Sequence, residues 1–163
     1  MYQYRARESS DQHPLYAYAP DCNDVRASAM NWADRLASHS GMSVGLAVPH
    51  PEGAQLIHHV FRPDNSPQHL MTGEIRPFGD ALAQALAAPH DRRCVYTDGA
   101  GADGRPLPDS GCMAVAFPCP GPDPGAAAIG VTGPRHHLDP AGPEAGRYEA
   151  LLRETADAIS ATL

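Results

Sequence analysis

Apolar side chains recur at helical spacing near both ends of the chain. In residues 24–40 the stripe consists of Val25, Ala29, Trp32, Ala33 and Leu36. The segment 138–163 carries a second stripe that begins at Tyr148 and ends at Leu163. A period near 3.6 residues predicts a helix with one buried face in each segment. A third, shorter and alanine-rich pattern predicts a helix over residues 78–88, which Pro89 closes.

The middle of the chain alternates between apolar and small or polar residues, as strands do. The pattern predicts five strands, over residues 42–50, 54–63, 93–98, 112–119 and 125–133. The first two are separated only by a Pro-Glu-Gly turn, so we expect them to form a hairpin. The glycine- and proline-rich stretch 99–111 is typical of a flexible connection.

Helices at both ends with strands between them indicate an α+β domain, with an antiparallel sheet and helices packed on it. With 163 residues, the chain is long enough for one domain with its own core. We expect an N-terminal arm over residues 1–22 and a single domain over residues 23–163.

The last two predicted strands each have one bulky face and one nearly bare face. Side chains alternate along a strand. The small set comprises Cys112, Ala114, Ala116, Ala126, Ala128, Gly130 and Thr132, and the bulky set comprises Met113, Val115, Phe117, Ile129 and Val131. We expect the bulky sides to meet the terminal helices in the core, and the small sides to form a shallow floor.

Two interpretations of that floor remain open. The short helix 78–88 has small residues of its own and could pack directly on the floor, since Ala and Gly let backbones approach closely. Alternatively, the helix roofs a small pocket in which Thr132, the Cys112 thiol and backbone N–H groups supply the polar contacts.

Charge and cysteine usage narrow the functional classes. The net charge is −7 and the twelve basic residues are all arginine, scattered along the chain, so a nucleic-acid-binding face is not expected. The four cysteines form no C-x-x-C pair, which disfavours a zinc site and favours free thiols. His58 and His59 are adjacent in a predicted strand and face opposite ways, so they cannot share a metal ion. His136 and His137 are expected in a solvated loop.

Several segments together resemble the effector domain of IclR-type transcription regulators. The residues "GEIRPFGDALAQALAA" are similar to that family's strand-to-helix segment, and "GCMAVAFP" with "GAAAIGVTGP" looks like its paired core strands. The helix leading into "GMSVGLAV" and the helix "YEALLRETADAIS" match its opening and its end. The resemblance spans roughly residues 24–162. It implies a GAF- or PAS-like fold that binds a small organic acid or aromatic effector between the sheet and the short helix.

The resemblance also implies a set of ligand-binding positions. They are Phe78, Ala81, Leu82, Asp98, Cys112, Gly130 and Thr132. Gly130 departs from the family, which often has a serine there, and so removes one hydroxyl donor. The family's N-terminal winged helix-turn-helix domain has no counterpart in this sequence, so we expect no direct DNA binding by this chain.

The sequence thus predicts a cytoplasmic ligand sensor that forms a homodimer and needs no cofactor, metal or membrane. No apolar run approaches the length of a membrane span, and no signal peptide is evident. One alternative is an enzyme that uses the same pocket, with Cys112 as a thiol nucleophile or redox centre. Another is a protein-interaction scaffold without a ligand.

Overall fold

The structure is a computed structural model that describes residues 21–64, 66–100, 105–120 and 125–163. The expected arm, residues 1–22, lies outside this part of the chain apart from its last two residues. Of these, Cys22 already begins the first described helix. The assignment of residues 23–163 to a single domain stays a prediction.

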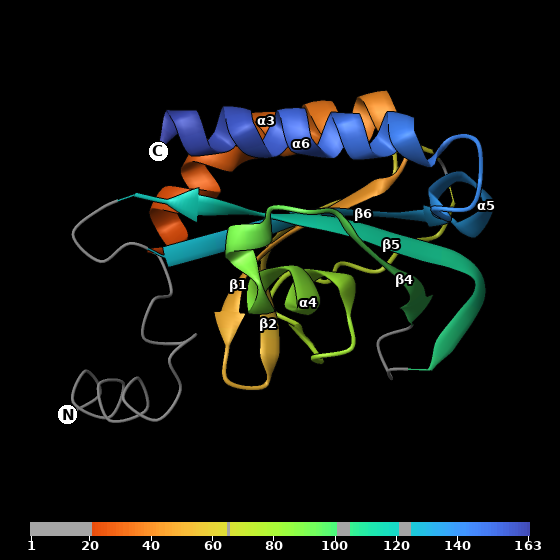
Figure 1. The fold of residues 1–163 in the computed structure, drawn as a ribbon, viewed down its shortest axis with the longest axis horizontal. Coiled ribbons are helices and arrows are strands. Elements are labelled where there is room, and N and C mark those ends of the chain that lie inside the picture. Colours follow the sequence, from red (N-terminus) through yellow and green to blue (C-terminus); the bar gives the residue numbers. More distant parts are fainter. Residues whose placement is uncertain (1–20, 65, 101–104, 121–124) are drawn as a thin grey trace.

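A six-stranded antiparallel sheet runs through the centre of the molecule (Figure 1). Its strands in chain order are β1 (Ser43–His50), β2 (Gly53–Val60), β3 (Ile75–Arg76), β4 (Val95–Ala100), β5 (Pro106–Cys119) and β6 (Gly125–Pro134). In space their order is β3-β2-β1-β6-β5-β4, so β1 and β6, far apart in sequence, are neighbours at the centre. The predicted hairpin of β1 and β2 and the α+β class are confirmed.

Two long helices cover one face of the sheet and a short helix covers the other (Figure 1). The long helices are α3 (Cys22–Ser40) and α6 (Ala145–Thr162), and the short one is α4 (Ala81–Ala87). The connections also contain a 3-10 helix, η1 (Pro89–Asp91), and the short helix α5 (Arg135–Leu138). At the end of α3, Gly41 adopts a left-handed conformation (φ 69°) and its N–H donates to the Ala37 carbonyl.

The main core lies between the sheet and the helices α3 and α6. From β5 and β6 it contains the bulky sets predicted from the alternation, with Phe117 and Ile129 fully buried. From the helices it contains Leu36 and Leu152 among others. Large apolar side chains therefore gather on one face of the sheet, where their burial supplies most of the hydrophobic stabilisation.

The opposite face carries the small residues, and helix α4 packs on part of it. Ala114, Ala116 and Ala128 form a second buried cluster with residues of α4 such as Ala83 and Leu86. Because alanine side chains are short, the helix lies close to the sheet here and leaves no space. Over this part of the floor, close packing of helix on sheet is the correct interpretation.

The predicted flexible stretch 99–111 is wrong over most of the residues that the structure describes. Strand β4 continues to Ala100, and β5 already begins at Pro106. Asp98 pairs with Gly111 and Ala100 with Pro106, so antiparallel pairing extends the hairpin past its prolines and glycines. The histidines at 136 and 137 lie in helix α5 and not in a loop.

A β-bulge in β2 changes which of its side chains face the short helix. Leu46 pairs with His58 and Ala47 with Leu56, so Ile57 is the extra residue. The bulge shifts the alternation, and His59 therefore faces the same side of the sheet as Leu56. The carbonyl oxygen of Ile57 accepts a hydrogen bond from Arg26 Nε on α3 at 2.7 Å, which holds the bulge in place.

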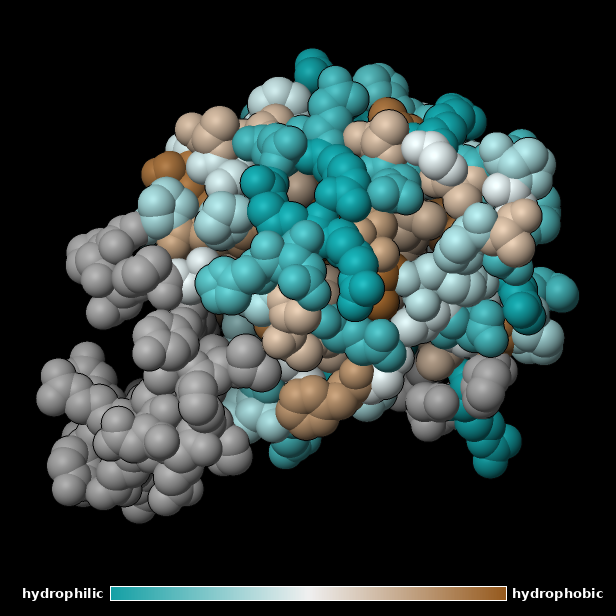
Figure 2. All heavy atoms as spheres, in the orientation of Figure 1, coloured by the Kyte–Doolittle hydropathy of each residue, from teal (hydrophilic) through white to brown (hydrophobic). Residues whose placement is uncertain are grey.

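Polar side chains cover most of the face seen in Figure 2, and apolar side chains appear there in separate spots. The large apolar residues exposed on the described surface are Met30, Phe61, Leu70, Phe78 and Leu107. None of the described helices combines the length and the apolar character that a membrane crossing requires.

Replacing Phe117 with alanine tests the position of the main core. The ring is fully buried against the long helices, so Phe117→Ala should lower the free energy of unfolding by about 3–5 kcal/mol, measured by urea denaturation. Phe78→Ala is the matched control, since Phe78 is 54% exposed, and should change that free energy by less than about 0.5 kcal/mol. Equal effects of the two substitutions would contradict the assigned core.

Candidate functional site

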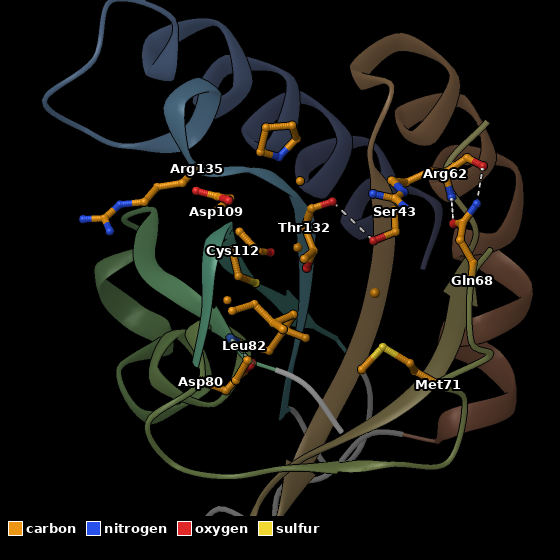
Figure 3. Close-up of a pocket in the computed structure, with 18 of the residues that line it drawn as sticks. Ser43, Arg62, Gln68, Met71, Asp80, Leu82, Asp109, Cys112, Thr132 and Arg135 are labelled. Carbon is orange, nitrogen blue, oxygen red and sulfur yellow. Dashed lines mark hydrogen bonds between the residues drawn. The ribbon is translucent and has the colours of Figure 1, made fainter. Parts of the chain in front are cut away.

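An open cavity of about 1080 Å³ lies where helix α4 no longer covers the small-residue face. Its inner wall consists of the start of β1, the end of β6 and the middle of β5, represented by Ser43, Thr132 and Cys112. Leu82 and Asp80, from the start of α4, form one boundary, and Met71 lies on another (Figure 3). The second interpretation of the floor, a pocket beside the short helix, therefore applies to this end of the sheet.

A row of small polar side chains crosses the inner wall. Ser43 is the cross-strand partner of Thr132, and Thr132 is the partner of Cys112, so the three lie side by side on adjacent strands (Figure 3). Ser43 Oγ donates to the Thr132 carbonyl oxygen at 3.3 Å, and a side-chain hydrogen bond joins Thr132 to Cys112. Thr97 continues the row on β4, and its buried hydroxyl makes no hydrogen bond to the described residues. We call Ser43, Thr132 and Cys112 the polar row.

A pair of glycines lies next to the polar row. Gly45 and Gly130 are cross-strand partners, and both line the cavity. The Leu82 side chain lies over them, because a Cβ atom on Gly130 would come within 3.2 Å of Leu82 Cδ2 and one on Gly45 within 3.5 Å of Leu82 Cδ1. The two missing side chains therefore make room for Leu82, which closes the inner end of the cavity.

A buried ion pair lies at the base of the cavity. Arg76 Nη2 and Asp80 Oδ1 are 3.1 Å apart, and the two side chains are only 8% and 9% exposed. Arg76 Nη2 also lies 3.4 Å from the Ala100 carbonyl oxygen, to which it donates. Asp80 caps helix α4, because its Oδ2 accepts from the Leu82 backbone N–H at 3.0 Å. The pair thus links β3, β4 and the start of α4.

Charged and aromatic side chains form the outer rim. On one side are His59 and Arg62, and Arg62 Nε lies 3.8 Å from Asp64 Oδ2. On the other side is Arg135, whose Nε lies 3.6 Å from Asp98 Oδ1 and 4.0 Å from Asp139 Oδ2. Burial lowers the pKa of His59, so its imidazole is neutral at physiological pH. The Met71 N–H donates to His59 Nδ1 at 3.4 Å, which places the ring proton on Nε2.

Of the seven ligand-binding positions implied by the resemblance, the structure places four on the cavity wall. These are Leu82, Cys112, Gly130 and Thr132. Ala81, the first residue of α4, is fully buried, and Phe78 is exposed; neither lines the cavity. Asp98 lies outside the wall, beside Arg135. Ligand binding by any of these seven residues stays a prediction.

Three residues that the sequence analysis did not single out, Ser43, Arg76 and Asp80, line this cavity, and so does His59, which was considered there only as a metal ligand. The role of Asp80 could have been predicted from the sequence, since an aspartate just before an alanine-rich helix is typical of an N-cap. The roles of Ser43 and Arg76 could not, because their places depend on strand register and on a pair formed in the folded chain. Among the described residues, no group of three potential metal ligands is placed to hold a metal ion, and His58 and His59 do face opposite sides.

The Cys112 thiol is poorly suited to nucleophilic chemistry. Burial, together with nearby Asp80, raises its pKa to about 12, and the hydrogen bond with Thr132 and the Arg76 charge only partly oppose the shift. A reactive cysteine needs a lowered pKa, because the thiolate is the nucleophile. Within the described part of the chain, no disulfide bond joins the four cysteines.

The fold matches solved structures of regulatory proteins. An IclR transcriptional regulator from Alicyclobacillus acidocaldarius aligns with a TM-score of 0.65 over 93% of this chain and 72% of its own, at 17% identity. The effector domain of IclR from Acinetobacter sp. ADP1 aligns with a TM-score of 0.62 over 83% of this chain and 95% of its own, at 12% identity. This chain has the fold of an IclR-type effector domain.

Sequence relatives agree with the IclR-type fold. A glycerol operon regulatory protein from Streptomyces griseus is 29% identical over 88% of this chain and 68% of its own length. A protein of the same name from Streptomyces coelicolor is 46% identical over 69 residues, which are 42% of this chain and 27% of that protein. No family model matches the chain. The chain therefore resembles IclR-type effector domains in fold, and regulators of a glycerol operon in sequence.

Selective alkylation tests the state of the Cys112 thiol. With a pKa of about 12, fewer than about one thiol in ten thousand is ionised at neutral pH. We expect Cys112 to resist iodoacetamide in the folded chain and to react after unfolding in urea, as measured by peptide mass spectrometry. The half-buried Cys22 serves as the internal comparison and should react sooner. Modification of Cys112 at least as fast as Cys22 in the folded chain would support the enzyme alternative.

Proposed function

We propose that this chain binds a small organic effector in the cavity and serves as the sensing module of a transcription regulator. The observation that carries the proposal is the cavity itself, which lies between the sheet and the short helix in an IclR-type fold. Its wall combines apolar surface from Leu56, Met71 and Leu82 with a few convergent polar groups. Concave sites of this composition are typical of small-molecule binding.

The relatives suggest the biological setting. Both Streptomyces proteins are named as regulators of a glycerol operon. By analogy, we propose that this chain takes part in controlling genes for the use of a small carbon compound. We further propose that it acts in the cytoplasm as a homodimer, without enzymatic activity, and that a separate protein or segment contacts DNA. The net charge of −7 supports the last point, because phosphate binding requires a basic surface.

Filling the cavity tests its role in binding. Native mass spectrometry of the freshly purified full chain should show a co-purified small molecule and the mass of a dimer. Gly130→Leu should abolish retention of that molecule, because its side chain must displace Leu82 and enter the cavity. Gly146→Leu is the matched control, since a Cβ atom there meets nothing within 4 Å, and it should retain the molecule.

Thr132→Leu provides a second filled variant in case Gly130→Leu does not fold. It adds bulk on the cavity wall and leaves the strand backbone unobstructed. Far-ultraviolet circular dichroism and the unfolding midpoint establish that each variant is folded. Retention of the same molecule by either folded variant, at the level of the unaltered chain, would place the binding site elsewhere and contradict the proposal.

A further inference from the structure

The charges around the cavity point to the class of molecule that it takes. We infer that the cavity selects a small uncharged polyhydroxy compound over a carboxylate or phosphate of the same carbon skeleton. This inference rests on the proposed function, because it concerns the ligand of the same site. It departs from the organic acid or aromatic effector that the resemblance implies, and it follows from how the arginines, the helix start and the hydroxyl groups are arranged.

The three arginines that line the cavity already have carboxylate partners. Arg76 pairs with Asp80, Arg62 with Asp64, and Arg135 with Asp98 and Asp139. Of these pairs, Arg76 with Asp80 matters most, because it is buried at the base of the cavity. A ligand carboxylate would have to break that pair, and doing so would leave Asp80 as an uncompensated buried charge. The arginines therefore offer little net attraction to an anion.

The start of helix α4 is also occupied. Backbone N–H groups at a helix start attract anions, but here Asp80 already accepts from the Leu82 N–H. An anionic ligand at this position would meet the Asp80 carboxylate directly. The remaining carboxylates on the wall, Asp109 and Asp139, and the net charge of −7 add to the repulsion.

The histidines do not change this balance. His59 is neutral because burial lowers its pKa, and its Nε2–H is an uncharged donor. His69 Nε2 lies 3.7 Å from Glu74 Oε1, so any positive charge on it already has a partner. The ring of His136 lies against that of His137, with centroids 4.1 Å apart.

The inner wall instead offers uncharged hydroxyl and thiol groups. The Ser43 hydroxyl already donates to the Thr132 carbonyl oxygen and the Thr132 side chain is bonded to Cys112, so the two hydroxyl oxygens can each accept a hydrogen bond from a ligand. A chain of ligand hydroxyls can donate to successive members of the polar row, whereas an ionised carboxylate group can only accept. Apolar surface lies beside the polar row. Leu82, which covers the glycine pair, and Met71 present this surface to the carbon atoms of the ligand. The polar row and the apolar surface beside it complement a polyol, which carries hydroxyl groups along a chain of carbon atoms.

Matched pairs of compounds test the inference on the full chain. Glycerol is compared with glycerate and glycerol 3-phosphate, and sorbitol with gluconate, by titration followed in amide NMR spectra. We expect at least one polyol to shift the Gly45, Gly130 and Thr132 signals, with an affinity at least about tenfold above that of its charged counterpart. Thr132→Val should weaken that binding at least about fivefold, because it removes one hydroxyl while conserving shape.

A single charge change should reduce or remove the preference for the polyol. Asp80→Asn removes the nearer of two carboxylates from Arg76 and leaves Glu74 Oε2, 4.0 Å from Arg76 Nη1, while asparagine still caps the helix. We expect gluconate to bind this variant at least about tenfold more tightly than it binds the unaltered chain, with sorbitol little affected. Two controls lie outside the cavity: Asp157→Asn on α6, and Thr155→Val, whose hydroxyl bonds only within α6. Neither should change the preference.

Two results would overturn the inference. If glycerate, gluconate or glycerol 3-phosphate shifts the same cavity signals with equal or higher affinity than its polyol, the assigned class is wrong and the proposed effector site remains. If no compound of either series shifts any cavity signal, the inference is also wrong. The proposed function is then decided separately by whether the co-purified molecule is lost on filling the cavity.

Discussion

The strands β1, β6 and β5 carry bulky side chains on one face and alanine, glycine and small polar groups on the other. Because side chains alternate strictly along a strand, this difference in size divides the sheet into two unlike surfaces. The bulky face holds α3 and α6 through a core that includes Phe117 and Ile129. The side chains on the other face are too small to form a core of their own, so this face is buried only where another element packs against it.

Helix α4 covers only part of that face, and the cavity begins where the helix starts. Asp80 determines that start by capping the helix, and Arg76 holds Asp80 in place from β3. Leu82 then extends over Gly45 and Gly130 and closes the inner end. A structural ion pair, a helix cap and two absent side chains together produce a cavity whose inner wall carries uncharged hydroxyl and thiol groups. The chemistry of the proposed binding site is therefore a consequence of how the sheet is covered.

Much of this arrangement could be predicted from the sequence, because it depends on local alternation. The spacing of apolar and small residues predicts the terminal helices, the short helix, and the two unlike faces of residues 112–117 and 126–132. Only part of the site could be predicted from the sequence. The bulge at Ile57, which aims His59 into the cavity, leaves no mark in a single sequence, and the pairing of Arg76 with Asp80 exists only after folding. The strand over residues 106–111 was missed because its prolines and glycines resemble a loop, whereas pairing with β4 and β6 holds it extended.

The most direct test of the account locates a bound molecule on the small-residue face. Isotope-filtered nuclear Overhauser spectra of the full chain, recorded with its co-purified molecule or a saturating polyol, report which protein protons lie next to it. The account predicts contacts to the methyl groups of Leu82 and Thr132, from the two sides of the cavity. Contacts only to residues of α3 or α6, or to the surface outside the cavity, would contradict it.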